Sequence, residues 1–158
     1  MGEAAADVRL APGDVAPDFE LDGTGGRRYR LSDHRGSPVV VVFYPGDNTP
    51  VCTVQLNSYT EDFSRFAEVG AQVLAISSQD VASHEAFAKS QGGFAFPLLA
   101  DVDKHVARMY GILGPLGSYR RSVFIVDAEG IIRYAHRSAA GLTYRPVAEL
   151  IGALRALG

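Results

Sequence analysis

The chain has 158 residues, of which 47% are hydrophobic and 21% charged. This composition is typical of one globular domain and excludes a disordered, collagen-like or coiled-coil chain. The net charge of −3, with no dense cluster of Lys and Arg, argues against nucleic-acid binding. The longest apolar run, residues 39–44, is far shorter than the roughly 20 residues that cross a bilayer. Residues 1–8 lack the basic and apolar regions of a signal peptide. We therefore expect a cytoplasmic protein with one domain over residues 1–158, residues 1–12 being a loose lead-in.

Short runs of β-branched, aromatic and other apolar residues, bounded by turn-forming residues, predict strands. The expected strands are residues 18–21, 28–31, 39–44, 72–77, 121–126 and 131–136. The run at 39–44 is continuously apolar, as in a strand that is buried on both faces, and the runs at 72–77 and 122–126 look similar. Turn-forming residues at 22–26 join the first two strands, and those at 127–130 join the last two.

Between these strands, apolar residues recur every three or four positions, which predicts helices. One helix is expected to begin at Pro50 and to present a single apolar face, formed by Leu56, Tyr59, Phe63 and Phe66. Further helices are expected over residues 80–90, 103–110 and 147–157. The order of elements predicts an α/β protein, in which an N-terminal β-hairpin precedes a mixed central sheet with helices on both faces.

The only cysteine, Cys52, lies at the end of the segment 44–52, which joins the strand at 39–44 to the next helix. Thr49 is a favoured N-cap residue and Pro50 suits the first helical position, so Cys52 is expected in the first turn of the helix. Unpaired backbone N–H groups and the positive end of the helix dipole favour a thiolate there. The phase of Cys52 with Leu56 turns its side chain toward the core. A structural role for Cys52, in which the side chain only fills space in the core, explains this sequence pattern equally well.

The pattern Pro45-x-x-x-Thr49-x-x-Cys52 is similar to the active-site pattern of the peroxiredoxins, which are thiol peroxidases of thioredoxin-like fold. Residues 43–53 most resemble the Q-type branch, also called bacterioferritin comigratory proteins. Residues 13–19, 31–36 and 121–127 resemble, in order, the family's opening strand, the segment before its core strand and the strand that carries its active-site arginine. The resemblance implies a thioredoxin-like fold and a thiol-dependent peroxidase without metal, haem or flavin.

The resemblance also implies a role for five residues. Cys52 would attack a peroxide and become a sulfenic acid. Thr49 would hydrogen-bond the thiolate and the incoming peroxide, and Arg121 would hold the thiolate form and stabilise charge on the two oxygens. Pro45 would shield the pocket from water, and Gln55 would orient the arginine.

Arg120 competes with Arg121 for this role. Alternation along a strand sends the two side chains to opposite faces, and the family register selects Arg121. Many Q-type proteins have a second, resolving cysteine five residues after the first, where this chain has Asn57. An internal disulfide is therefore impossible. The substrate would be hydrogen peroxide or a small organic hydroperoxide, and the reductant an external thiol such as a thioredoxin, a glutaredoxin or a low-molecular-weight thiol. The protein would be a monomer or a homodimer.

Two alternatives remain open: a redox sensor whose oxidised Cys52 signals with little turnover, and a family member whose thiol is vestigial. The four histidines lie far apart in the sequence and are each expected at the surface or at a helix end. They are His34, His84, His105 and His136. Asp101-x-Asp103 resembles part of a calcium loop but lacks its Gly and Glu, so we expect these residues to cap a helix instead.

Overall fold

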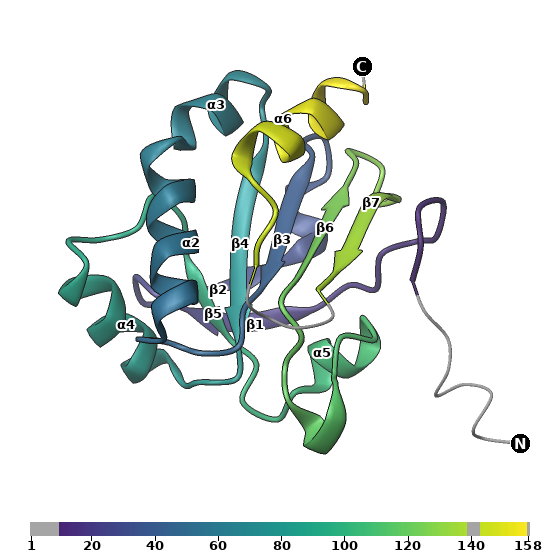
Figure 1. Ribbon diagram of the computed structural model, residues 1–158. Helices are drawn as coiled ribbons and strands as arrows, with labels where there is room; N and C mark the ends of the chain where they lie inside the picture. The colour runs from purple at the N-terminus through teal and green to yellow at the C-terminus, as the bar shows by residue number, and fades with distance from the viewer. Residues whose placement is uncertain (1–9, 139–142, 158) are drawn as a thin grey trace, which may run out of the picture.

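A mixed seven-stranded sheet forms the centre of the molecule, with the strand order β2-β1-β5-β4-β3-β6-β7 (Figure 1). The computed structural model describes residues 10–138 and 143–157, so residues 1–9 of the expected lead-in lie outside it. The strands are β1 (Glu20–Gly23), β2 (Arg27–Arg30), β3 (Val39–Phe43), β4 (Gln72–Ser77), β5 (Leu98–Ala100), β6 (Ser122–Val126) and β7 (Ile132–Arg137). β4 is parallel to both β3 and β5, and the remaining pairs are antiparallel. The expected mixed sheet is confirmed.

Helices cover both faces of this sheet. They are α2 (Pro50–Glu61), α3 (Phe63–Glu68), α4 (Val81–Ser90), α5 (His105–Met109) and α6 (Val147–Arg155), with short 3-10 turns η1 (Leu31–His34) and η2 (Pro115–Gly117). Alternate residues of β3 serve two separate cores, as the period of two in a strand requires. Val40 and Val42 pack with α2, α4 and α6, whereas Val39 and Val41 pack with α5 and η1.

The strands of the N-terminal hairpin are displaced from those expected: β1 covers residues 20–23 and not 18–21, so Asp22 and Gly23 belong to the strand and not to the turn. Asp22 pairs with Arg28, and Gly23 pairs with both Arg27 and Leu99. A Cβ at position 23 would lie 2.7 Å from the ring of Tyr29. Glycine is therefore needed here for close packing. The sequence did not reveal this role, because a glycine in such a segment is first interpreted as a turn residue.

The helix expected after Pro50 is two helices, which is a second correction. The chain breaks at Asp62, whose φ and ψ are −100° and 17°, and α3 begins at the next residue. Tyr59 and Phe66 lie on either side of the break and still pack together, with ring centroids 6.1 Å apart. Because both helices turn their apolar sides to the same core, the spacing of apolar residues gave no sign of the break.

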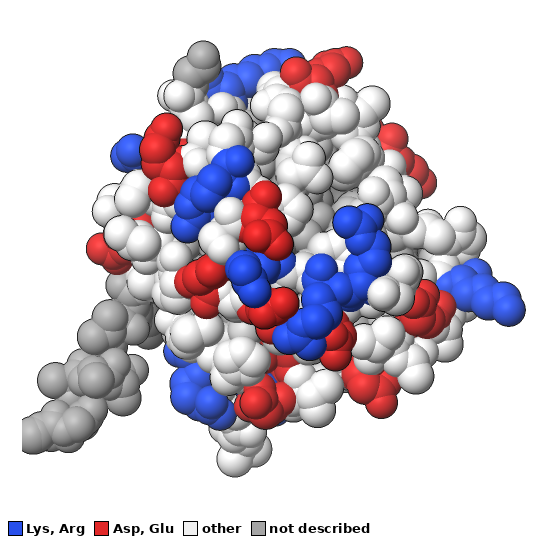
Figure 2. Space-filling view, turned by 180° about the vertical axis from the view of Figure 1, so that it is seen from behind, with Lys and Arg blue, Asp and Glu red and all other residues white. Residues whose placement is uncertain are grey.

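The outer surface carries mixed charge. On the hairpin, Arg28 pairs with Glu20 and Asp22, and Arg30 pairs with Glu20. Figure 2 shows acidic and basic side chains intermixed on the side turned away from the viewer in Figure 1, with no continuous basic surface there. Of the helices that the structure describes, none is long and apolar enough to cross a membrane.

Candidate active site

Cys52 is the third residue of α2 and has no exposed surface. Thr49 is the N-cap with an extended backbone and Pro50 is the first helical residue, as predicted. The hydroxyl of Thr49 does not cap the helix. It donates to the carbonyl of Gly46 at 3.0 Å, so that Oγ1 is left able only to accept further hydrogen bonds.

Arg121 lies directly before β6 and is almost completely buried. Its Nη1 donates to Oε1 of Gln55 at 2.6 Å, and Gln55 lies three residues after Cys52 on α2. The amide of Gln55 donates in turn to the hydroxyl of Tyr59 at 3.3 Å, which donates to the carbonyl of Arg145 at 2.6 Å. This chain of contacts joins the arginine to the helix that carries the thiol.

The neighbouring residue Arg120 is directed elsewhere, since its Nε donates to the carbonyl of Ser138 at 3.4 Å. Arg121 is in phase with Val123, which belongs to the same core cluster as Cys52. Strand alternation thus separates the two arginines as expected. Pro45, the remaining candidate, is half-buried in the segment between β3 and α2.

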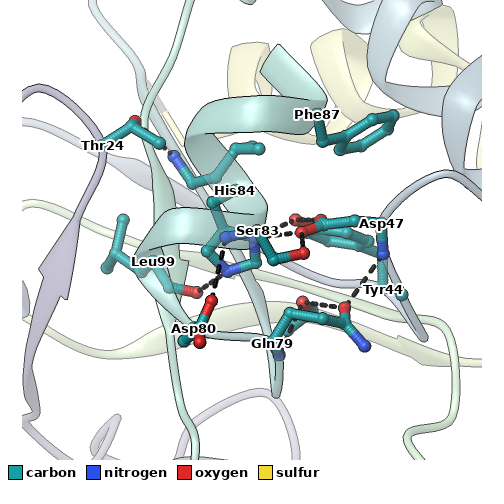
Figure 3. A network of polar contacts seen from close by, with 12 residues as sticks. Thr24, Tyr44, Asp47, Gln79, Asp80, Ser83, His84, Phe87 and Leu99 are labelled. Atoms are coloured by element: carbon teal, nitrogen blue, oxygen red, sulfur yellow. Dashed lines mark hydrogen bonds and ion pairs between the residues drawn. The ribbon is translucent and has the colours of Figure 1, made fainter. Parts of the chain in front are cut away.

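Sequence reasoning missed a buried polar network beside this segment, in which His84 is central (Figure 3). The expectation that His84 lies at the surface is wrong, because its side chain is fully buried, although it lies near the start of α4 as its fourth residue. Its Nδ1 lies 2.7 Å from Oδ2 of Asp47, and its Nε2 lies 2.9 Å from the carbonyl of Leu99. The one signal in the sequence was that His84 shares the spacing of Phe87, the buried apolar residue of α4.

Asp47 receives two further hydrogen bonds, from the hydroxyls of Tyr44 and Ser83, both at 2.7 Å. Burial opposes ionisation of Asp47, but the hydrogen bonds from His84, Tyr44 and Ser83 outweigh it, and the pKa of the carboxyl is lowered below 3.8. Burial, followed by the nearby charge of Asp47 and with a smaller contribution from Cys52, raises the pKa of Tyr44. Tyr44 thus stays protonated and donates to the carboxylate.

The lowered pKa of Asp47 predicts how stability changes with pH. A carboxyl whose pKa is lower in the folded state stabilises the fold above its unfolded pKa, and this contribution is lost as pH falls through the folded pKa. Asp47→Asn breaks a buried pair and is expected to lower the free energy of unfolding by about 3–5 kcal/mol near pH 7. The difference from wild type should shrink once the pH falls below 3.8. Urea unfolding curves over this range measure it.

Asp22→Asn is the matched control, because Asp22 also pairs with a basic side chain but its carboxylate is 59% exposed. We expect this substitution to change stability by less than about 1 kcal/mol. A pH-independent difference between wild type and Asp47→Asn would contradict the linkage.

Asp101, Asp103 and His105 bring three potential metal-ligating atoms within 4.8 Å of one another. Both oxygens of Asp101 are already occupied, since they accept from the backbone N–H groups of Val106 and Ala107 at the start of α5. Asp101 thus pairs with backbone donors in the first turn of α5, whereas the N-cap position itself is Lys104 and not an aspartate. The structure gives no reason to place a metal there.

The mixed sheet, the helices on both faces and a thiol in the first turn of the helix after β3 define a protein of thioredoxin-like fold. The sequence pattern of the AhpC/TSA family matches residues 12–135. The crystal structure of peroxidoxin BcpB from Mycobacterium tuberculosis superimposes with a TM-score of 0.84 at 31% identity, over 95% of this chain and 99% of that one. The chain belongs to the AhpC/TSA family and is a peroxiredoxin.

Among the curated relatives, peroxiredoxin 2 from Thermoplasma acidophilum is 37% identical over 92% of this chain and 75% of its own length. A chloroplastic peroxiredoxin Q from Triticum aestivum is 35% identical over 82% of this chain. The match spans 60% of the length of that plant protein. These similarities agree with the Q-type resemblance of residues 43–53.

Proposed function

We propose that the protein is a thiol-dependent peroxidase that reduces hydrogen peroxide and small organic hydroperoxides at Cys52. One observation carries the proposal. The guanidinium of Arg121, the residue directly before β6, is hydrogen-bonded at 2.6 Å to Gln55, one helical turn beyond the buried Cys52. A buried guanidinium tied to the helix of a thiol has no use in packing an apolar core, whereas it suits a reaction in which charge develops on oxygen.

In the proposed reaction the thiolate of Cys52 attacks the terminal oxygen of the peroxide. The S–O bond forms as the O–O bond breaks, so the sulfur is oxidised by two electrons to sulfenic acid and the peroxide is reduced. The leaving hydroxide or alkoxide takes up a proton and departs as water or an alcohol.

Ionisation of the thiol alone cannot make this reaction fast. A free cysteine has a pKa near 8.5, so complete ionisation at pH 7 raises the thiolate population only by roughly 30-fold. The remainder must come from positioning the peroxide and from stabilising charge as the O–O bond breaks. We assign the positioning to Oγ1 of Thr49, which can accept a hydrogen bond from the peroxide O–H, and the stabilisation to Arg121, oriented by Gln55. Pro45 would shield the reacting atoms from water.

The chain has one cysteine, so a thiol from outside must reduce the sulfenic acid. That thiol attacks the sulfenic sulfur and releases water, and a second thiol then reduces the mixed disulfide and restores Cys52. A thioredoxin, a glutaredoxin or a low-molecular-weight thiol can each supply these electrons. This requirement favours a reducing, cytoplasmic compartment.

The test is a stopped-flow measurement of the reduced protein with hydrogen peroxide, followed by intact mass, with Cys52→Ser as control. We expect a second-order rate constant far above that of a free thiol, and a gain of one oxygen in the wild type only. A rate like that of a simple thiol would favour a redox sensor or a vestigial thiol over a peroxidase.

A further inference from the structure

The buried pair of His84 and Asp47 has no place in the reaction described above, yet it lies against the segment that carries Thr49. Asp47 belongs to the loop between β3 and α2, here called the active-site loop (residues 44–49), and His84 belongs to α4. Their side chains are 0% and 1% exposed. Charges at this depth are destabilising unless they are paired and fully hydrogen-bonded, so the contacts of the pair show what it holds in place.

The partners of His84 determine its protonation (Figure 3). Its Nε2 faces the carbonyl of Leu99 at 2.9 Å, and because a carbonyl can only accept, Nε2 carries a proton. Its Nδ1 faces Asp47, which also accepts from the hydroxyls of Tyr44 and Ser83. A carboxyl group that accepts from two hydroxyl donors has the arrangement of an ionised carboxylate, which can only accept. Nδ1 therefore donates as well, and His84 is an imidazolium.

The same network fixes the backbone of the active-site loop. The N–H of Asp47 donates to Oε1 of Gln79 at 2.9 Å. Gly46 packs against that side chain so closely that an added Cβ would lie 3.3 Å from its Nε2. The carbonyl of Gly46 accepts the hydrogen bond from Thr49, and between them Asn48 adopts a φ of 64°, in the left-handed region. The hydroxyl of Thr49 is thus bonded to the part of the loop that the network anchors.

We propose that His84 is a positioning residue for the peroxide reaction: its imidazolium holds Asp47, and through Asp47 it fixes the loop that orients the hydroxyl of Thr49 at the first turn of α2. The proposal rests on the peroxidase function proposed above, because the reaction rate is one of its two readouts. His84 acts through the loop and not on the reacting atoms.

Two amide variants separate the two hydrogen bonds of His84. The amide nitrogen of asparagine is as many bonds from Cα as Nδ1, and that of glutamine is as many as Nε2. His84→Asn can thus still donate to Asp47, whereas His84→Gln can donate only to the carbonyl of Leu99. Both variants lose the ring and the charge, so a purely structural role for His84 predicts similar effects for both.

We expect His84→Gln to react with hydrogen peroxide about 10- to 100-fold more slowly than wild type, since a small displacement of a positioned group has costs of this order. His84→Asn should stay within about threefold of wild type, because the link to the loop survives. Both are measured by stopped flow, well below the melting temperature of each variant. His105→Gln, which changes an exposed histidine at the start of α5, should leave the rate unchanged.

The second readout is amide hydrogen exchange of residues 46–53, which does not depend on peroxide chemistry. It should be faster in His84→Gln than in wild type or His84→Asn. The proposal is wrong if the rate constants of the two variants fall by the same factor, or if neither rate constant falls. If the wild type itself reacts like a free thiol, the proposed peroxidase function is wrong. Amide hydrogen exchange then tests the anchoring of the loop by His84 on its own. Equal exchange in wild type and His84→Gln would then overturn the anchoring of the loop.

Discussion

Replacing Arg121 with methionine is expected to lower the second-order rate constant for hydrogen peroxide by about 10²–10³, the usual effect of removing one donor that stabilises developing negative charge. Methionine keeps much of the apolar length of the side chain but removes the guanidinium. The oxygen of Gln55 loses its partner, and a buried unpaired acceptor is expected to lower the free energy of unfolding by about 1–3 kcal/mol. The rate should therefore fall far more than the stability. Stopped-flow kinetics and urea unfolding of the same samples measure the two effects.

Arg120→Met is the matched control, because it removes an equal charge one residue away whose Nε is bonded to the carbonyl of Ser138. We expect its rate constant to stay near that of wild type. If both substitutions lowered the rate equally, general electrostatic attraction would explain the effect and the specific contact with Gln55 would not. If Arg121→Met lost stability and kept its rate, Arg121 would be a structural residue.

Excess peroxide is expected to convert Cys52 to sulfinic acid in the wild type, because the chain has no second thiol to trap the sulfenic acid. Asn57→Cys should protect it. The tethered thiol and a second peroxide compete for the sulfenic acid, and the thiol acts at an effective concentration on the order of millimolar. If the two rate constants are comparable, a peroxide concentration roughly tenfold below that value should give about tenfold more disulfide than sulfinic acid. Intact mass after peroxide treatment distinguishes the two products.

Helix geometry adds a condition to this prediction. Residues 52 and 57 both lie in α2, where five residues of regular helix place their Cα atoms roughly 8–9 Å apart. A disulfide tolerates at most about 7 Å, so α2 must unwind before the bond can form. Asn57→Ser removes the contact of Asn57 with Gln91 without adding a thiol, and it should oxidise like wild type. Equal protection by the serine variant would mean that altered packing, and not a disulfide, is responsible.

The local environment of Cys52 was predictable from the sequence because each of its determinants is local. Thr49 and Pro50 mark the start of α2, and the spacing from Cys52 to Leu56 and Tyr59 identifies its buried side. Phase along β6 likewise separates Arg121 from Arg120. The contact of Arg121 with Gln55 joins residues 66 positions apart, and it was expected only because of the family resemblance.

The role of His84 could not be predicted in this way. A single histidine is most simply explained as a residue near the surface, and its shared spacing with Phe87 alone does not identify its partners. Its partners come from the active-site loop and from β5, neither of which is near it in the sequence. The break at Asp62 was missed for a different reason, since it leaves the apolar face of the two helices continuous.

For the proposed reaction, the complete burial of Cys52 distinguishes the reaction partners by size, and therefore sets the order and timing of events. A peroxide of a few atoms needs only a small fluctuation of the loop to reach the sulfur, whereas a reducing thiol carried on a protein needs the first turn of α2 to open. We therefore expect the rate of reduction to level off as the donor concentration rises, at a ceiling given by how often that turn opens. Above that ceiling, the lifetime of the oxidised protein depends on the helix and no longer on the supply of reductant.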